Sequence, residues 1–589
     1  RFAKEMLPQI FRPDHPVLQV TFPREYKVEL EQLLRDLDSR IFTASDALGW
    51  VYQFWQTRRK QEVNASGNKI GADELPAVTQ LFTEPYMVSF LIHNTLGAWY
   101  AGRVLAQNPE LATQAESEVE LREAVALPGI TWDYLRFIRD HEDQPWRPAA
   151  GTFDEWPRQA SELKILDPCC GSGHFLVAVF NHLVSIRMAE EGMTAKEACD
   201  AVLRDNLHGL EIDERCTQIA AFALALAAWT YPNAGGYRFL PKPRIASSGL
   251  APNTKKDKWL ALAGDDTHLQ NGMAKLYDLF QEAPILGSLI DPSSVVAGDL
   301  FAGGIDELHP LLVKAMAKEN NDYDNQELGV TACGIADAVK ILGGRYHLII
   351  TNVPYLARGK QHDSLKEFCE TYYDDAKNDI ATVFLNRLLK LNHTGGTTAL
   401  VMPQNWLFLG SYERFRRELL EAKRWDFVAR LGPGAFESIS GEVVNVILLS
   451  ISSSPLENHA LVGLDATTPR TAQEKAKLLR DAELKTLLQV EQLRNPDARV
   501  SLDELDSGRL LSAFANSFQG ISPADFPHYG RCFWEIAPGG IASPEWSFWQ
   551  STVLITQPYG GRELLLWHNA DLRRAVEIGK AFIRGQNAW

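Results

Sequence analysis

The sequence predicts an α/β fold with a doubly wound, largely parallel sheet, and two observations predict it. Short apolar runs such as LKILD, NLHGLEI, YHLIITN and VVNVILLSI alternate with helical patterns between residues 76 and 455. Strands that alternate with helices are typical of a parallel sheet covered on both faces. Several of these runs end in an acidic residue or in Asn, at the strand ends where open α/β sheets bind their ligands.

Changes in pattern divide the 589 residues into four parts. Residues 1–75 are expected to be mostly helical, because Ile41 to Trp55 carries apolar residues at roughly helical spacing. Residues 76–455 hold the predicted sheet. Residues 456–510 are charged and are predicted to form a helical connector. Residues 511–589 intersperse aromatic, Gly and Pro residues, which predicts the start of a separate domain.

The composition is that of a globular protein, with 45% hydrophobic and 23% charged residues. No run of eighteen uncharged apolar residues occurs, so no membrane span is predicted. The seven cysteines are odd in number and lack the spacing of a zinc site, which favours free thiols in a reducing cytoplasm and no metal. No signal peptide is visible, and because the chain begins with Arg1, its natural start is expected to be missing.

The net charge of −16 argues weakly against nucleic acid as a partner, although positive charge can be confined to one cleft. One local basic cluster stands out: Arg414, Arg416, Arg417, Lys423 and Arg424. A solvated helix face is its more frequent interpretation, and a nucleic-acid contact is the alternative.

The sharpest local feature is an apolar strand that runs into a glycine-containing turn and then a helix, in the sequence ILDPCCGSGHF from Ile165 to Phe175. Gly171 and Gly173 allow a tight turn and a close approach of the backbone to a ligand, whose polar groups could face the amides of the helix N-terminus. The segment is not a phosphate-binding Walker loop, because no Gly-Lys-Ser/Thr follows, and it lacks the full dinucleotide fingerprint.

Two further strands end in acidic residues. Glu211 lies near the end of the run NLHGLEI, about forty residues later, where it could accept hydrogen bonds from ribose hydroxyls. The alternative is an exposed acid in a strand–helix loop. Asp299, in VVAGDLF, could accept from an adenine amino group, although alone this signal is weak.

A buried strand ends in Asn352, followed by Val353, Pro354 and Tyr355. An exocyclic amine on a base is a poor nucleophile, because its lone pair is delocalised into the ring. An Asn side-chain carbonyl and a neighbouring backbone carbonyl can accept its two hydrogens and compensate the developing positive charge. Tyr355 can stack on a base taken out of the duplex. The structural alternative is an Asx-Pro turn after a strand.

Together these residues resemble the amino-methyltransferase family, in particular its gamma-order group, in which the cofactor half precedes the catalytic half and target recognition comes last. The phrase LFTEPYMVSF at 81–90 is similar to the motif that closes over the methionine end of the cofactor. The segment GAF at 434–436, followed by GEVVNVILL, is similar to the motif whose aromatic residue packs on the flipped base. Within the family, the chain resembles the large methyltransferases of type IIG restriction–modification systems and the PglX group of BREX phage defence.

The resemblance implies a Rossmann-like methyltransferase sheet and a cytoplasmic, site-specific DNA methyltransferase. Such an enzyme transfers methyl from S-adenosyl-L-methionine to the exocyclic amine of an adenine flipped out of double-stranded DNA, with other phage-defence proteins as further partners. It implies these cofactor-binding residues: Thr83, Pro85, Asp167, Pro168, Gly171, Gly173, Glu211, Asp299 and Asn352. It implies these catalytic residues: Asn352, Val353, Pro354, Tyr355 and Phe436.

The sequence departs from the family pattern in two places. Val353 stands where the family usually has the first proline of its catalytic motif; its backbone carbonyl is kept, but the fixed φ of proline is lost. The resemblance implies that residues 511–589 begin a target-recognition domain that is truncated here.

Three alternatives stay open at this stage. The same motif can methylate amines on RNA bases or a glutamine amide in a protein. The chain could instead be a non-catalytic or weakly catalytic DNA-binding subunit of a defence complex. A fused endonuclease is the third alternative, although residues 1–75 show no persuasive nuclease pattern.

Overall fold

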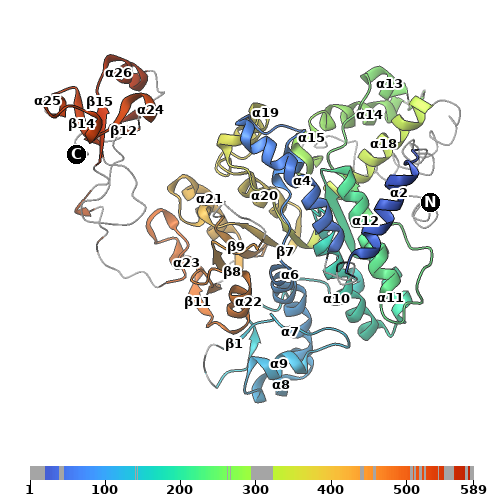
Figure 1. The fold of residues 1–589 in the computed structure, drawn as a ribbon. Helices are drawn as coiled ribbons and strands as arrows, with labels where there is room; N and C mark the ends of the chain where they lie inside the picture. Colours follow the sequence, from blue (N-terminus) through green and yellow to red (C-terminus); the bar gives the residue numbers. More distant parts are fainter. Residues whose placement is uncertain are drawn as a thin grey trace. The chain divides into compact units, whose positions relative to one another are not determined.

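The computed structural model describes residues 20–293, 323–437, 444–454 and 459–503, except 39–40, 42–45, 140, 142, 262 and 265–266. Beyond residue 503 it describes 509, 513–515, 521–522, 525–541, 543–549, 563–577 and 582–583. The chain divides into two compact units, Arg1–Glu504 and Leu505–Trp589, coloured from blue to orange and from orange to red in Figure 1.

The larger unit is built on a nine-stranded sheet with the order β11-β10-β8-β9-β7-β6-β3-β4-β5. Seven of its strands lie parallel to a neighbour, in the runs β7-β6-β3-β4-β5 and β10-β8. Strand β9 is antiparallel to β7 and β8, and β11 is antiparallel to β10. The expected α/β fold with a mostly parallel sheet is therefore confirmed. The strands are β3 (Ile165–Asp167), β4 (Leu207–Glu211), β5 (Arg244–Ser247), β6 (Tyr346–Asn352), β7 (Asn392–Pro403), β8 (Arg424–Gly432), β9 (Val446–Ser452), β10 (Ala460–Asp465) and β11 (Lys485–Leu488).

Both faces of the sheet are buried, which explains why its strands read as continuous apolar runs rather than as alternating ones. Neighbouring residues of one strand point to opposite faces. On β6, Ile349 belongs to one hydrophobic core, and Leu348 and Ile350 belong to the other. The two cores therefore lie on opposite sides of a single sheet, as in a doubly wound fold.

Each core is closed by its own set of helices, visible on the two sides of the strands in Figure 1. The first core contains buried residues of α14 (Thr267–Phe280), α15 (Ala283–Leu286), α18 (Tyr323–Leu342), α19 (Asp363–Tyr372), α20 (Ile380–Leu389) and α21 (Glu413–Ala422). The second contains buried residues of α6 (Pro85–Ile92), α7 (Ala98–Gln107), α10 (His174–Glu191), α11 (Ala195–Asp205), α12 (Glu214–Thr230) and α22 (Ala472–Asp481).

Glycines and capping residues set the ends of the helices that follow the first strand. Helix α10 begins after Gly173 and ends at Gly192, both with positive φ. Thr194 and Glu197 then form a reciprocal capping box that begins α11. These glycines and capping residues determine where α10 ends and α11 begins in the connection from β3 to β4.

The N-terminal region of the larger unit forms a series of helices. These are α2 (Arg24–Asp36), α4 (Ala47–Ser66) and α5 (Leu75–Thr79), followed by a π-helical turn at His93–Gly97 and the helices α8 (Pro109–Gln114) and α9 (Glu118–Ala124). Helix α4 contacts α5 and α12. Its N-cap is Asp46, whose side chain accepts from the Gly49 amide at 3.0 Å.

Residues 456–510 differ from the helical connector that we expected. They contribute the strands β10 and β11 to one end of the sheet, and α22 lies between them. The charged residues that favoured a helix over the whole segment belong to α22, while β11 is an edge strand with mostly exposed side chains and so carries little apolar signal.

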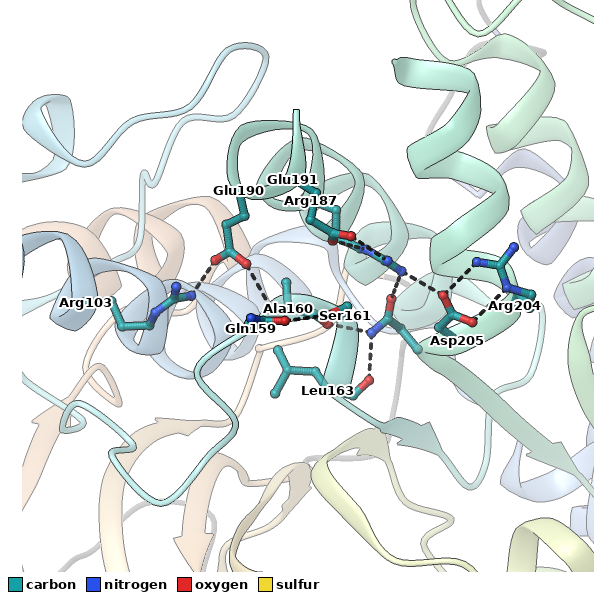
Figure 2. Close-up of polar contacts among 11 residues, drawn as sticks. Arg103, Gln159, Ala160, Ser161, Leu163, Arg187, Glu190, Glu191, Arg204 and Asp205 are labelled. Carbon is teal, nitrogen blue, oxygen red and sulfur yellow. Dashed lines mark hydrogen bonds and ion pairs between the residues drawn. The ribbon is translucent and has the colours of Figure 1, made fainter. Parts of the chain in front are cut away.

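A buried polar network joins the helices to the edge of the sheet opposite the carboxyl ends of its strands (Figure 2). Arg187 of α10 pairs with Glu191 and with Asp205, and it donates to the side-chain carbonyl of Asn206 at 3.2 Å. Asn206 in turn donates to the backbone carbonyls of Ala160 and Leu163, at 2.8 and 2.7 Å. This network fixes the start of β3 and β4 relative to α10.

The smaller unit contains a three-stranded antiparallel sheet with the order β13-β15-β14 and a strand pair β12-β16. Its elements are β12 (Ile521–Ser522), α24 (Phe526–Tyr529), β13 (Gly530–Cys532), α25 (Pro538–Ile541), β14 (Trp546–Trp549), β15 (Leu564–Trp567), α26 (Ala570–Glu577) and β16 (Phe582–Ile583). Among the described residues of both units, no helix is long and apolar enough to cross a membrane.

Candidate cofactor and catalytic site

The sheet reverses its winding direction at β3, and this places the site. From β3 the chain continues to β4 and β5 on one side and returns to β6 and β7 on the other. Ligands of open α/β sheets bind at such a switch point, outside the carboxyl ends of the strands. Asp167 ends β3, Glu211 ends β4 and Asn352 ends β6, so the three residues meet at this edge.

The loop after β3 is shaped by two glycines. Gly171 and Gly173 have φ values of +51° and +88°, in the left-handed region that other residues avoid. A Cβ at Gly173 would also lie 3.0 Å from the Cα of Ala220 on α12. The loop therefore needs glycine for conformation and for packing, and it delivers the N-terminus of α10 to the cavity.

Glu211 holds this loop in place. Its carboxylate accepts from the Gly171 amide at 2.9 Å and from the Asp213 amide at 3.1 Å. Burial raises the pKa of Glu211, and the two amide donors partly oppose that shift. The residue is therefore buried, and the alternative of an exposed acid in a loop does not apply to it.

Asp167 is the second buried acid of the site. It accepts from the Cys169 amide at 3.2 Å, and burial raises its pKa to about 7. Asp167, Pro168, Gly171 and Glu211 all line one cavity at the switch point. A carboxyl group whose pKa is raised in a cavity is typical of a functional site, although ion pairs in structural positions can do the same.

Asn352 is held at both ends of its side-chain amide. Its Nδ2 donates to the Thr83 hydroxyl at 3.1 Å, and its Oδ1 accepts from the Tyr355 hydroxyl at 2.8 Å. Burial raises the pKa of Tyr355 well above its usual range, so its hydroxyl stays protonated and can donate. This pair of bonds directs the amide oxygen towards Tyr355, and a carbonyl oxygen has a second lone pair for another donor.

The segment that follows Asn352 is fixed by its neighbours. Val353 is buried, and its amide donates to the Val401 carbonyl of β7 at 3.4 Å. The Asp379 carboxylate, at the start of α20, accepts from the amides of Leu356 and Ala381 at 3.3 and 3.0 Å. The conformation that proline would have locked at position 353 is therefore held by packing and by the strand pairing.

The segment Thr83–Pro85 leads from the cavity into helix α6 and lies beside the residues that follow β8. Thr83 lines the cavity, and Pro85 is the first residue of α6. The Tyr86 hydroxyl donates to the Ala435 carbonyl at 2.8 Å, and the Glu84 carboxylate accepts from the Glu437 amide at 2.9 Å. Two segments that lie about 350 residues apart in sequence, and that both resemble family motifs, therefore contact each other.

Several predicted site residues are not among the cavity-lining residues of the described chain: Pro85, Gly173, Val353 and Tyr355. Phe436 is buried in the core beside α6 and is not among the cavity-lining residues of the described chain. Asp299 lies outside the described residues. In the basic cluster, Arg416 is fully buried and donates to the backbone carbonyls of Trp406, Leu409, Asp497 and Ala498, so it has a structural role.

The structure also brings residues to the cavity that sequence analysis missed. Helix α4 contributes Asp46, Gly49, Tyr52 and Gln53, and the segment after α5 contributes Gln80. Ser172 of the glycine loop donates to the Asp46 carboxylate at 2.6 Å. Among the described residues, no group of three or more His, Cys, Asp or Glu is arranged to hold a metal ion.

Comparisons with known proteins identify the kind of domain that carries this site. Residues 205–434 match the family described as Eco57I restriction-modification methylase, and residues 149–235 match the MmeI DNA-methyltransferase domain. The chain is 26% identical over 464 residues to the adenine-specific methyltransferase PglX of Lacticaseibacillus casei (strain Zhang), which covers 77% of this chain. The chain is a homologue of adenine-specific methyltransferases.

A second such homologue is the adenine-specific methyltransferase BrxX of Escherichia coli O9:H4 (strain HS), 27% identical over 439 residues and 70% of this chain. The chain spans about a third of the length of these two homologues, 36% and 34%. A solved structure of a DrdV–DNA complex matches with a TM-score of 0.40 and 13% identity, over 82% of this chain and 39% of that chain.

Proposed function

We propose that this chain transfers a methyl group from S-adenosyl-L-methionine to the exocyclic amine of adenine in double-stranded DNA. The observation that carries the proposal is the meeting, at one switch point, of a glycine loop held by Glu211 with an Asn352 amide fixed between Thr83 and Tyr355. The homologues named as adenine-specific methyltransferases support the same chemistry.

The residues of the cavity fit the proposed cofactor. The positive-φ glycines leave room for a ligand close to the backbone: apart from Gly171 and its two chain neighbours, no atom of the described chain lies within 4 Å of a Cβ built at Gly171. Glu211 lies where a strand-end acid accepts from ribose hydroxyls. Asp167, Pro168, Thr83 and Pro85 would surround the methionine half. When bound, S-adenosyl-L-methionine supplies the methyl group as an electrophile on a positively charged sulfur.

Asn352 and Val353 would prepare the acceptor amine. The Asn352 Oδ1 and the Val353 backbone carbonyl would accept its two hydrogens, which draws the nitrogen towards tetrahedral geometry and compensates the positive charge that develops on it. Thr83 and Tyr355 keep the amide oriented before substrate arrives, so little reorganisation remains for the reaction step.

Tyr355 would stack on the extruded base. Taking a base out of a duplex costs a few kcal/mol, and stacking on an aromatic ring recovers part of that cost. Pro354 lines the same cavity and would close its side. Phe436 is the proposed second stacking residue from the sequence resemblance, and the structure holds this ring in the core.

We further propose a cytoplasmic role in phage defence or restriction–modification, with other defence proteins as partners. The proposed domain division extends the methyltransferase part beyond residues 76–455 to include β10 and β11 of the same sheet, and it keeps residues from 511 as the start of target recognition. A transfer assay that compares duplex DNA, RNA and protein as acceptors tests the substrate. Label in DNA supports the proposal, label in RNA or protein replaces the substrate, and cofactor binding without any transfer favours a non-catalytic subunit.

A further inference from the structure

The N-terminal helix α4 reaches the cofactor cavity from outside the sheet and is attached to it at two separate points. At its start, Asp46 accepts from the Ser172 hydroxyl of the glycine loop at 2.6 Å. Nearly two turns later, the Tyr52 hydroxyl donates to the Asp213 carboxylate at 2.5 Å, and Asp213 follows Glu211 at the end of β4. Helix α4 therefore spans from the loop of β3 to the end of β4.

The approach is close enough to depend on a glycine. A Cβ at Gly49 would lie 2.5 Å from the Ser172 hydroxyl, closer than atoms can pack. Trp50 packs on Phe82 with ring centroids 4.2 Å apart, and Phe82 stacks on His174 at the start of α10. These contacts place the pocket-facing side of α4 directly against the residues that hold the glycine loop.

Two side-chain carbonyl oxygens in this wall are enclosed without a hydrogen-bond partner in the described chain. They belong to Gln53 of α4 and to Gln80 after α5, and both residues line the cavity. The Gln80 amide donates to the Cys216 sulfur at 2.9 Å, which directs its other end, the oxygen, elsewhere. Buried polar atoms are nearly always paired in folded proteins, so two unpaired acceptors in one cavity call for a donor that binds there.

The position of these two glutamines indicates which half of the cofactor would supply the hydrogen-bond donor. Gln80 is bound to Cys216 in the first turn of α12, and Tyr52, the residue before Gln53 on α4, is bound to Asp213 at the N-cap of the same helix. That turn directly follows Glu211, the proposed ribose acceptor. Ribose hydroxyls and the adenine amino group are donors, whereas the ring nitrogens of adenine are acceptors and would not satisfy a carbonyl oxygen.

We propose that α4 and Gln80 form the outer wall of the cofactor pocket and that the Gln53 and Gln80 carbonyls accept hydrogen bonds from the nucleoside half of the bound cofactor. This inference rests on the proposed function, since it assumes S-adenosyl-L-methionine as the ligand. It makes residues outside the sheet part of the cofactor site, in a stretch that neither matched family model covers.

The test is calorimetric binding of S-adenosyl-L-homocysteine, and of adenosine as a competitor, to the whole chain. Gln53→Ala and Gln80→Ala should each weaken both ligands by about 3- to 10-fold, as expected for one neutral hydrogen bond. Gln61→Ala is the matched control, because Gln61 is an exposed glutamine on the same helix, and it should change neither affinity.

The possible outcomes distinguish a failure of this inference from a failure of the proposed function. Unchanged affinity in both variants, with a wild-type chain that binds, would overturn the inference and leave the function standing. Weaker binding of S-adenosyl-L-homocysteine with unchanged binding of adenosine would also overturn the inference, because the contact would then be to the amino-acid half of the ligand. A wild-type chain that binds neither ligand would overturn the proposed function itself.

A second measurement does not depend on the folding of any variant. Hydrogen exchange of the wild-type chain, with and without S-adenosyl-L-homocysteine, reports whether the ligand orders α4. Slower exchange at residues 47–66 on binding is the expected result. Exchange that slows in the glycine loop but is unchanged in α4 would contradict the proposed wall.

Discussion

Asn352 is the residue on which the proposed chemistry depends most. Replacing it with Ala removes the oxygen that would compensate charge on the amine and leaves the cofactor cavity otherwise intact. We expect kcat to fall by about 100-fold or more, as for other single acceptors or donors aimed at developing charge, while the affinity for cofactor changes little. Single-turnover methyl transfer and calorimetric binding measure the two quantities separately.

Asn405→Ala is the matched control for that experiment, since Asn405 is an exposed Asn at the start of a 3-10 turn after β7. It should retain full activity. Near wild-type transfer by Asn352→Ala would remove the catalytic assignment of the motif.

Asp167 predicts a specific pH dependence of stability. Its pKa in the folded protein is raised by burial from 3.8 to about 7, so the folded state holds the proton more tightly than the unfolded chain does. The stability from this group is fully present below about pH 4 and is lost as the pH rises through about 7. Asp167→Asn cannot ionise and escapes that loss.

As the pH rises from about 4 to about 8, we therefore expect the free energy of unfolding of the variant to increase relative to that of the wild type, by at most about 4 kcal/mol. Urea unfolding midpoints at the two pH values measure the difference. An identical stability difference at both pH values would show that Asp167 has the same proton affinity in the folded and unfolded states.

At the scale of elements, the network around Arg187 and Asn206 determines how α10 is joined to the strands (Figure 2). Asn206→Ala would leave two buried carbonyls without their donor and would remove one acceptor from Arg187. We expect a loss of about 2–4 kcal/mol in the free energy of unfolding, because buried polar groups that lose a partner pay their desolvation cost.

The control for this network is Arg204→Ala. Arg204 pairs with the same Asp205 but is mostly exposed, and surface pairs contribute about 0–1 kcal/mol. Denaturant unfolding compares the two variants. Equal losses would mean that burial does not distinguish these contacts.

Much of the fold could be predicted at this scale, because the buried strands carry their signal locally. Strands such as β6 and β9 are covered on both faces, so most of their residues are apolar and the run stands out in the sequence. The short edge strand β11 has mostly exposed side chains and gives no such signal. The helical signal of α22 is therefore the strongest local pattern in residues 456–510, which is why the sequence predicts a helical connector there.

The site was only partly accessible to sequence analysis, for a similar reason. Glu211 and Asn352 end strong strands, so their meeting at one sheet edge follows from topology. The contribution of α4 depends on tertiary packing, because Tyr52 and Gln53 look like polar residues of a solvated helix. Arg416 illustrates the converse: it belongs to a basic run, yet it is buried among backbone carbonyls.

At the scale of the whole molecule, the proposed ligand should stabilise only part of the chain. The cavity lies within Arg1–Glu504, and Leu505–Trp589 is a separate compact unit. S-adenosyl-L-homocysteine at about 100 times its Kd should add about 2.7 kcal/mol to the free energy of unfolding of the unit that binds it. Differential scanning calorimetry should show that one transition shifts and the other does not; a shift of both would contradict independent unfolding.

The net charge of −16 also belongs to this scale. A strongly acidic chain repels the DNA backbone at long range, so binding to a duplex depends on local positive potential and should weaken steeply as salt rises. Binding titrations at two salt concentrations measure that slope. An affinity that does not change with salt would mean that few phosphates are contacted.

The central claim is tested most directly by the transfer of labelled methyl from S-adenosyl-L-methionine to unmethylated genomic DNA, followed by nucleoside analysis. We predict label in N6-methyladenine, and none after Asn352→Ala. Label in a cytosine product, or no label from a chain that binds the cofactor and duplex DNA, would contradict the proposed function.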